Sequence, residues 1–179
     1  IAFALVVSFL NAYCIVLSFV CLALACVYPF MKRFTHWPQL VLGLAYNFGV
    51  LMAFAQLQNH LSLTAWLLYG ASISWTLAYD TMYAVADKKD DVRLGLKSTA
   101  LGFGQYYRQI IAGFEGLMLA LLTWVGVMWQ LSAWYYVALA CCIPFFVYQD
   151  KLIKTQNLKA CIAAFSNNHW VGLVIFVGV

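Results

Sequence analysis

Long apolar stretches without charge alternate along the chain with short polar segments. Residues 34–79 contain no Asp, Glu, Lys or Arg, and their polar residues cluster in the segment 56–62, which reads QLQNHLS. A helix crosses the roughly 30 Å of membrane hydrocarbon with about 20 residues. The stretch therefore predicts two membrane-spanning helices joined by a tight turn from Gln56 to Ser62, where polar side chains meet headgroups and water.

A second stretch of this kind lies nearer the C-terminus. Between Arg108 and Asp150 the only charged residue is Glu115, and a polar break falls from Trp129 to Ser132. This stretch predicts two further spans. With the uncharged run 1–31 and the closing run 160–179, the pattern predicts six spans in total. We therefore expect an all-α fold, a polytopic transmembrane helical bundle that forms a single domain over residues 1–179.

The composition agrees with a membrane protein. Of the 179 residues, 65% are hydrophobic and 9% are charged, whereas soluble domains have about 45–50% and about 25%. This balance excludes a disordered chain, a soluble disulfide scaffold and an ordinary cytosolic enzyme. No segment has the composition of a separate soluble domain.

The basic residues are confined to alternate loops. All 10 Lys and Arg residues fall in the first, third or fifth predicted loop, and the second and fourth loops contain none. The positive-inside rule places such basic loops in the cytoplasm. The net charge of +4 is then the charge of a basic membrane face, and it does not require nucleic acid as a partner.

Acidic residues crowd the end of the third predicted span. Four of the chain's 6 acidic residues lie in one short segment, namely Asp80, Asp87, Asp90 and Asp91. A helix, at about 100° per residue, would place three of these carboxylates and one phenol on one face: Asp80, Tyr83, Asp87 and Asp91. Carboxylates on one face repel one another unless a cation lies among them, and hard oxygen ligands suit Mg²⁺. Asp80, Asp87 and Asp91 are therefore candidate metal ligands.

Two interpretations of the acidic segment stay open at this point. Magnesium prefers one or two carboxylates together with water and substrate phosphates, so the acidic face would form half of a diphosphate clamp. Alternatively, DKKDD is a solvated loop whose carboxylates are neutralised by Lys88 and Lys89. Asp80 fits the loop interpretation poorly because it directly follows an apolar run, where a carboxylate costs about 2.5–3.5 kcal/mol to insert.

A second polar group lies at the end of the first predicted span, where residues 28–33 read YPFMKR. If the helix continues past Pro29, the four-residue spacing brings the phenol of Tyr28 beside the ammonium of Lys32. Both groups can bind oxyanions, and Arg33 adds a planar guanidinium suited to a carboxylate or phosphate. The alternative is that Lys32 and Arg33 only determine how the span is oriented in the membrane.

Several strings of this sequence match one known family. They are YPFMKR at 28–33, AYDT at 78–81, the spaced acids from Asp87 to Asp91, GLKSTA at 95–100, FGQ at 103–105, VYQ at 147–149 and VGL at 171–173. The strings extend over almost the whole chain. On these residues the chain resembles the UbiA superfamily of intramembrane prenyltransferases, and in particular its members that prenylate 4-hydroxybenzoate.

The resemblance implies a fold and a metal site. In this superfamily about nine helices bring two Asp-rich motifs face to face, where they bind Mg²⁺ and the diphosphate of a polyprenyl donor. The second motif maps onto Asp87 and Asp91, and the Y-x-x-x-K element maps onto Tyr28 and Lys32. The first motif, N-D-x-x-D-x-x-x-D, has no counterpart in residues 1–179. Because the chain also opens on Ile1 within an apolar run, we expect it to be the C-terminal part of the enzyme, inactive without the N-terminal portion.

The resemblance also implies a reaction and roles for individual residues. The reaction transfers a polyprenyl group from polyprenyl diphosphate to the ring carbon ortho to the hydroxyl of 4-hydroxybenzoate, in ubiquinone biosynthesis. Its location is the bacterial inner membrane, with the mitochondrial inner membrane as second choice, and the active-site loops are cytoplasmic. The expected catalytic residues are Asp87, Asp91, Lys32 and Arg33. The expected diphosphate ligands are Tyr28, Lys32, Tyr83 and Lys97, and the expected ligand of the aromatic acid is Arg33.

Two alternatives remain. Another member of the superfamily would prenylate a different acceptor, such as a naphthoate, haem or chlorophyllide, but the YPFMKR and GLKSTA strings argue against it. The alternative from a different class is a transporter or channel, which would place acids near the middle of a span to line an ion path. Here the acids gather at one predicted cytoplasmic face beside basic residues, which suits a phosphorylated lipid better.

Overall fold

The structure is a computed structural model. It describes residues 10–179, so the beginning of the first predicted span lies outside the described residues. The described chain is helical and contains no strand, which confirms the predicted all-α class. Its elements are α2 (Ala12–Val27), η1 (Tyr28–Phe30), α3 (Met31–Phe34), α4 (Pro38–Tyr46), α5 (Phe48–Gln58), α6 (Leu63–Arg93), α7 (Thr99–Gly102), η2 (Gly104–Tyr106), α8 (Tyr107–Met128), α9 (Ala133–Ile153) and α10 (Leu158–Gly178).

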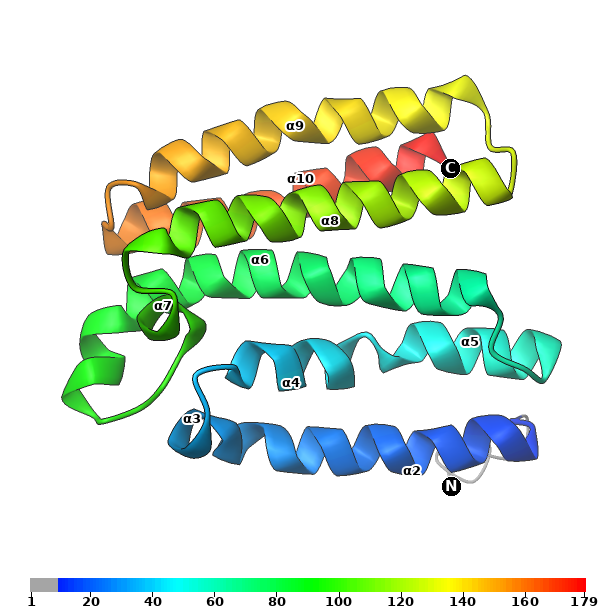
Figure 1. Cartoon of the computed structure of the whole chain (residues 1–179), viewed down its shortest axis with the longest axis horizontal. Helices are drawn as coiled ribbons and strands as arrows, with labels where there is room; N and C mark the ends of the chain where they lie inside the picture. Colours follow the sequence, from blue (N-terminus) through cyan, green and yellow to red (C-terminus); the bar gives the residue numbers. More distant parts are fainter. Residues whose placement is uncertain (1–9) are drawn as a thin grey trace.

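The long helices lie side by side, with α6 at the centre of the bundle (Figure 1). On one side α6 packs against α4 and α5, which pack in turn against α2; on the other side it packs against α8 and α10, which both contact α9. Buried apolar clusters around Met82 and Met118 fill the space between α6, α8, α9 and α10. A third cluster, around Leu51, joins α5 to α6. The connections after α3, α6 and α9 lie at one end of the bundle, at the left of Figure 1.

Among the described residues, five helical segments are long and apolar enough to cross a membrane: Ala12–Phe34, Pro38–Gln58, Gly104–Met128, Ala133–Ile153 and Leu158–Gly178. The remaining predicted span, the third along the chain, corresponds to α6, which is longer but more polar. At about 1.5 Å per residue, its 31 residues extend for about 46 Å, well beyond the roughly 30 Å of hydrocarbon. α6 therefore extends beyond the hydrocarbon, and its last turns carry the acidic segment.

The helix boundaries agree closely with the predicted turns. The turn predicted at 56–62 is observed at 59–62 because α5 continues to Gln58, and the break predicted at 129–132 separates α8 from α9. Ser62 begins α6 by accepting a hydrogen bond from the N–H of Ala65 at 3.4 Å, and Asn59 ends α5 in the left-handed conformation. The outer surface exposes large apolar side chains such as Phe19 and Phe176, as expected for a surface that faces lipid.

The second span is interrupted in its middle at Asn47, which separates α4 from α5. The Asn47 amide nitrogen Nδ2 donates to the carbonyl of Gly43 at 2.9 Å and to Thr76 Oγ1 at 2.8 Å. These two bonds satisfy a carbonyl at the end of α4 and fix the break against α6. Both halves of the span are apolar and uncharged, so the sequence pattern predicted one continuous helix.

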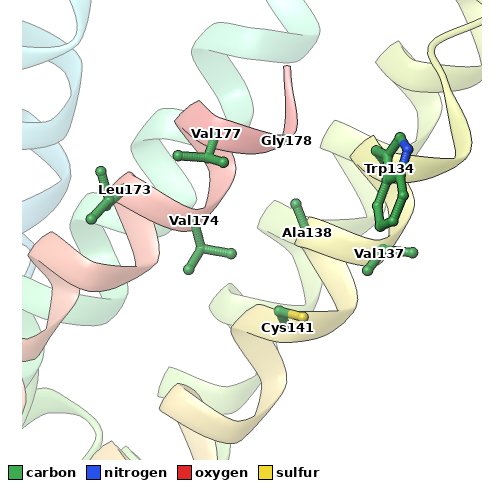
Figure 2. Close-up of a pocket in the computed structure, with 8 residues that line it drawn as sticks. All are labelled: Trp134, Val137, Ala138, Cys141, Leu173, Val174, Val177 and Gly178. Carbon is green, nitrogen blue, oxygen red and sulfur yellow. The ribbon is translucent and has the colours of Figure 1, made fainter.

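A large apolar groove lies between α9 and α10 (Figure 2). It is formed by the beginning of α9 and the end of α10, at the end of the bundle opposite the acidic segment (Figure 1). Its volume is about 560 Å³, and it is lined by Trp134, Val137, Ala138, Cys141, Leu173, Val174, Val177 and Gly178. The lining contains no charged side chain. The groove is therefore separate from the candidate site described next.

Candidate active site

The acidic face predicted from the sequence is the face of a continuous helix. α6 runs unbroken through Arg93, so the DKKDD segment is helical and not a loop. Along this face Asp91 is buried, Asp80 and Asp87 are half-buried, and Tyr83 is exposed. The interpretation as a solvated loop is therefore wrong, because the last carboxylate of the segment is removed from water.

Lys32 forms an ion pair with Asp91. The Lys32 ammonium nitrogen is 3.2 Å from Asp91 Oδ1, and the two side chains are 33% and 5% exposed, respectively. The second carboxylate oxygen, Asp91 Oδ2, is buried and has no hydrogen-bond donor in the described part of the chain. Such an oxygen is energetically costly unless a ligand or ion provides a partner. The buried end of α6 is thus incomplete without a further donor or cation.

The residues at this end of α6 fit a magnesium ion that also takes ligands from elsewhere. Asp91 Oδ2 and the half-buried Asp87, one turn earlier, supply hard carboxylate oxygens, and Mg²⁺ commonly binds one or two carboxylates together with phosphate and water oxygens. Within residues 10–179, no group of three or more His, Cys, Asp or Glu side chains could hold a metal ion. Asp80 precedes Asp91 by roughly 16 Å along the helix, so these two carboxylates cannot bind one ion together.

The cation shared by the acidic face is Lys32. Its charge acts on Asp80 and Asp87 in addition to its ion pair with Asp91. Burial raises the pKa of Asp87; Lys32 opposes this increase, whereas the carboxylates of Asp91 and Asp90 add to it. Burial and the neighbouring carboxylates together thus outweigh Lys32 at Asp87, and a bound cation would favour the ionised form of this carboxyl.

Tyr28 and Arg33 flank Lys32 on a helical run that continues past Pro29. The proline is tolerated because it lies at the start of η1, where its missing N–H is not needed. Tyr28 is half-buried, and the charges of Lys32 and Asp80 both act on it, in keeping with the predicted four-residue spacing. Arg33 is exposed and makes no hydrogen bond or ion pair within residues 10–179. Its guanidinium is free for a ligand.

The loop after α6 is fastened to the first span by Lys97. The Lys97 N–H donates to the carbonyl of Lys32 at 2.8 Å, and its ammonium donates to the carbonyl of Phe34 at 3.1 Å. Gly95 makes the turn possible because its φ of +66° is unfavourable for other residues. The ammonium predicted to bind diphosphate thus holds the end of α3, and the backbone N–H of the same residue fixes the backbone of Lys32.

Further buried residues, to which the sequence pattern assigned no role, support this loop. Gln39 Oε1 accepts from the N–H of Thr99 at 3.2 Å, and the hydroxyl oxygens of Thr81 and Thr99 are 2.8 Å apart. Thr81 and Thr99 lie in the AYDT and GLKSTA strings, and these strings are the sequence feature that could have indicated their role. Glu115 is also buried, in α8, and its Oε1 has no partner among the described residues.

A cleft adjoins the acidic face where the break between α4 and α5 meets α6 and α10. Its volume is about 390 Å³, and it is lined by Tyr46, Asn47, Trp75, Thr76, Tyr79, Phe165, Ser166, Asn168 and His169. Aromatic rings connect the cleft to the acidic face, because Phe165 packs edge to face on Tyr79 at 5.7 Å and on Tyr83 at 5.4 Å. The lining residues that α6 contributes, Trp75, Thr76 and Tyr79, all precede Asp80, so the cleft lies on the membrane side of the acidic face.

The sequence and the fold can now be compared with known proteins. The family model of the UbiA prenyltransferase family matches residues 1–172. The chain belongs to the UbiA prenyltransferase family. The resemblance inferred from YPFMKR, the spaced acids and GLKSTA is therefore confirmed, and membership of this family argues against the transporter or channel alternative.

Bacterial relatives in the UbiA family are similar over the whole chain. A 4-hydroxybenzoate octaprenyltransferase of Chromohalobacter salexigens is 48% identical over 179 residues, which are 100% of this chain and 60% of that protein. A 4-hydroxybenzoate octaprenyltransferase of Hydrogenovibrio crunogenus is 47% identical over 179 residues, which are 100% of this chain and 62% of that protein. The chain thus spans about 60% of the length of these relatives.

A solved structure from the same family has the same fold. The apo structure of a UbiA homolog from Aeropyrum pernix K1 superposes with a TM-score of 0.77 at 25% sequence identity. The match covers 96% of this chain and 64% of that chain. The UbiA-type membrane bundle predicted from the sequence is thereby confirmed for the part of the fold that this chain contains.

Proposed function

We propose that this UbiA-family chain takes part in Mg²⁺-dependent transfer of a polyprenyl group from polyprenyl diphosphate to 4-hydroxybenzoate, in ubiquinone biosynthesis. The new bond forms at the ring carbon ortho to the hydroxyl. The proposal rests above all on the buried Asp91, which is paired with Lys32 through one oxygen and has no donor for the other in the described residues. The names of the relatives, 4-hydroxybenzoate octaprenyltransferases, support the acceptor and the type of donor.

The proposed location is the bacterial inner membrane, with the acidic end of the bundle facing the cytoplasm. The relatives are bacterial. The connections after α3, α6 and α9 lie at the acidic end (Figure 1), and the basic residues lie in or beside these connections. The positive-inside rule places such an end in the cytoplasm, where a water-soluble acceptor and a diphosphate are both accessible.

The residues around Lys32 would bind the diphosphate of the donor. Asp87 and Asp91 would hold Mg²⁺ together with the family's first Asp-rich motif, and the ion supplies positive charge that stabilises the leaving diphosphate. The ammonium of Lys32 and the phenols of Tyr28 and Tyr83 donate hydrogen bonds to diphosphate oxygens. Lys97 contributes through the backbone, because its bond to the Lys32 carbonyl keeps that ammonium in place.

The bond changes determine what else this part of the chain must do. The allylic C–O bond breaks with its electron pair on the diphosphate, the ortho ring carbon forms the new C–C bond, and that carbon gives its proton to the released diphosphate or to water. Lys32 stabilises the negative charge where it develops. The surrounding apolar helices exclude water, which would otherwise capture the allylic cation. Arg33, exposed beside Lys32, binds the carboxylate of the acceptor.

A transfer assay tests the proposal. The full-length product of the gene is incorporated in lipid vesicles together with radiolabelled polyprenyl diphosphate. Transfer is measured with and without Mg²⁺, in the presence of 4-hydroxybenzoate, of a hydroxynaphthoate or of no acceptor. We expect labelled prenylated 4-hydroxybenzoate only when Mg²⁺ is present. Transfer to the naphthoate alone would replace the proposed acceptor, and the absence of transfer to either acceptor with Mg²⁺ present would refute the proposed function.

A further inference from the structure

We propose that the cleft between the α4–α5 break, α6 and α10 binds the phenolic ring of the acceptor, with its hydroxyl held between Tyr79 and Asn47. This inference rests on the proposed function and deepens it, because it assigns the acceptor hydroxyl to Asn47 and to Tyr79, a residue of the AYDT string to which no role has been assigned above. The argument comes from the shape of the cleft and from its free hydrogen-bonding groups.

The cleft has the properties of a site for a small aromatic molecule. Its volume of about 390 Å³ lies within the range of about 300–1,000 Å³ that is typical of small-molecule sites, which are mainly apolar and aromatic with a few polar groups. Trp75 and Tyr79 form part of its wall and pack edge to face at 6.1 Å. Trp75 is locked in place because its indole N–H donates to Asn168 Oδ1 at 2.8 Å, and Asn168 Nδ2 donates to the carbonyl of Ala164 at 3.2 Å.

Asn47 presents a free hydrogen-bond acceptor to the cleft. Its amide nitrogen donates to the carbonyl of Gly43 and to Thr76 Oγ1, and these two bonds use both of its N–H groups. The amide oxygen, Asn47 Oδ1, accepts no hydrogen bond within residues 10–179. The break in the helix therefore leaves one carbonyl oxygen available to a ligand.

Tyr79 presents a free donor beside it. Thr76 is buried, and its hydroxyl oxygen already accepts from Asn47, so its own proton requires an acceptor. Tyr79 Oη lies 3.2 Å from Thr76 Oγ1, and we assign Thr76 as the donor in this bond. The phenolic proton of Tyr79 is then not used within the protein, and it can be donated to a molecule in the cleft.

One free donor and one free acceptor together match a hydroxyl group, which both accepts and donates. A carboxylate only accepts and would be repelled by Asn47 Oδ1, and a prenyl chain uses neither group. The position also suits the reaction. Phe165 joins Tyr79 to Tyr83 of the acidic face, so a ring in the cleft lies along the path to the carboxylates that bind the donor's diphosphate.

The test compares ligands with and without the hydroxyl. Equilibrium binding of 4-hydroxybenzoate and of benzoate is measured for the full-length product with the native sequence and with Tyr79→Phe, which removes only the phenolic oxygen. We expect Tyr79→Phe to weaken 4-hydroxybenzoate binding about tenfold, as for the loss of one hydrogen bond, and to leave benzoate binding unchanged. In the transfer assay, the KM for 4-hydroxybenzoate rises to the same extent while the KM for polyprenyl diphosphate is unchanged.

The matched control is Tyr135→Phe, because Tyr135 is also buried and hydrogen-bonded, to the carbonyl of Leu122, but lies near the opposite end of the bundle. It should leave the preference for 4-hydroxybenzoate over benzoate intact.

The inference is overturned if Tyr79→Phe keeps the native preference, weakens the binding of both ligands equally, or raises only the KM for the prenyl donor. If the native protein transfers prenyl groups but Tyr79→Phe has no selective effect, only the cleft assignment fails. If the native protein neither binds 4-hydroxybenzoate nor prenylates it, the proposed function fails as well.

Discussion

Replacing Lys32 by methionine removes the ammonium that compensates Asp91 while keeping a side chain of similar length. In the variant both oxygens of Asp91 lack a partner among the described residues, because Oδ1 is paired with Lys32 and Oδ2 has no donor. The carboxylate is 5% exposed and cannot recover its hydration without local unfolding. We therefore expect Lys32→Met to destabilise the folded chain.

The magnitude follows from the burial of the two groups. Exposed ion pairs contribute about 0–1 kcal/mol, whereas loss of one member of a fully buried pair costs about 3–5 kcal/mol. Asp91 is 5% exposed but Lys32 is 33% exposed, which places this pair between the two limits, at about 2 kcal/mol by these principles. At about 2.1 cal/mol/K of unfolding entropy per residue, a protein of about 300 residues, the length of the relatives, loses about 1.6 °C of Tm per kcal/mol, so Tm should fall by about 3 °C.

Thermal unfolding of the full-length product in detergent, without added divalent metal, measures this effect. Lys89→Met is the matched control, because Lys89 is exposed on α6 and makes no ion pair in the described chain; its Tm should stay within about 1 °C of the native value, as for an ordinary surface substitution. In an Asp91→Asn background the ion pair is already absent and Lys32 acts only on the more distant Asp80 and Asp87, so Lys32→Met should then cost much less. An equal Tm loss in both backgrounds, or no larger loss than for Lys89→Met, would refute the role of the ion pair.

Two further predictions concern the acceptor and the packing of the bundle. Arg33→Ala should raise the KM for 4-hydroxybenzoate and leave the KM for polyprenyl diphosphate unchanged in the transfer assay; a loss confined to use of the donor would eliminate Arg33 as the carboxylate ligand. Gly126→Ala should destabilise by about 1–3 kcal/mol because the new Cβ would lie 2.6 Å from Tyr135 Cε1. Gly116→Ala is its control, with no atom within 4 Å of the new Cβ, and it should stabilise by about 0.5–1 kcal/mol, as expected inside a helix. Equal shifts of Tm in the two glycine variants would contradict the observed contact between α8 and α9.

The membrane spans were predictable because charge is excluded from hydrocarbon. Runs such as 34–79, with a polar cluster at 56–62, have few possible arrangements, and the structure has two helical segments with a turn at 59–62. The break at Asn47 was not predictable from this pattern, because it depends on hydrogen bonds to Gly43 and to Thr76 of another helix. An apolar pattern indicates that a segment lies in lipid, but it does not indicate which side chains contact one another inside the bundle.

In the candidate site, too, local patterns were predictable from the sequence and tertiary contacts were not. The periodicity of α6 placed Asp80, Asp87 and Asp91 on one face, and local spacing placed Tyr28 near Lys32. The ion pair between Lys32 and Asp91 joins residues 59 positions apart, and no local pattern could reveal it. The bond from Lys97 to Phe34 and the cleft beside Asn47 are likewise products of tertiary packing.

The most direct test of the proposed metal and diphosphate site is Mg²⁺-dependent prenyl transfer by carboxylate variants of the full-length product. Asp87→Asn and Asp91→Asn should each abolish transfer to 4-hydroxybenzoate although both variants still insert in the membrane. Asp90→Asn, the same substitution at an exposed neighbour on α6, should retain Mg²⁺-dependent transfer. Normal turnover in both Asp87→Asn and Asp91→Asn would contradict the assignment of this end of α6 to Mg²⁺ and the donor's diphosphate.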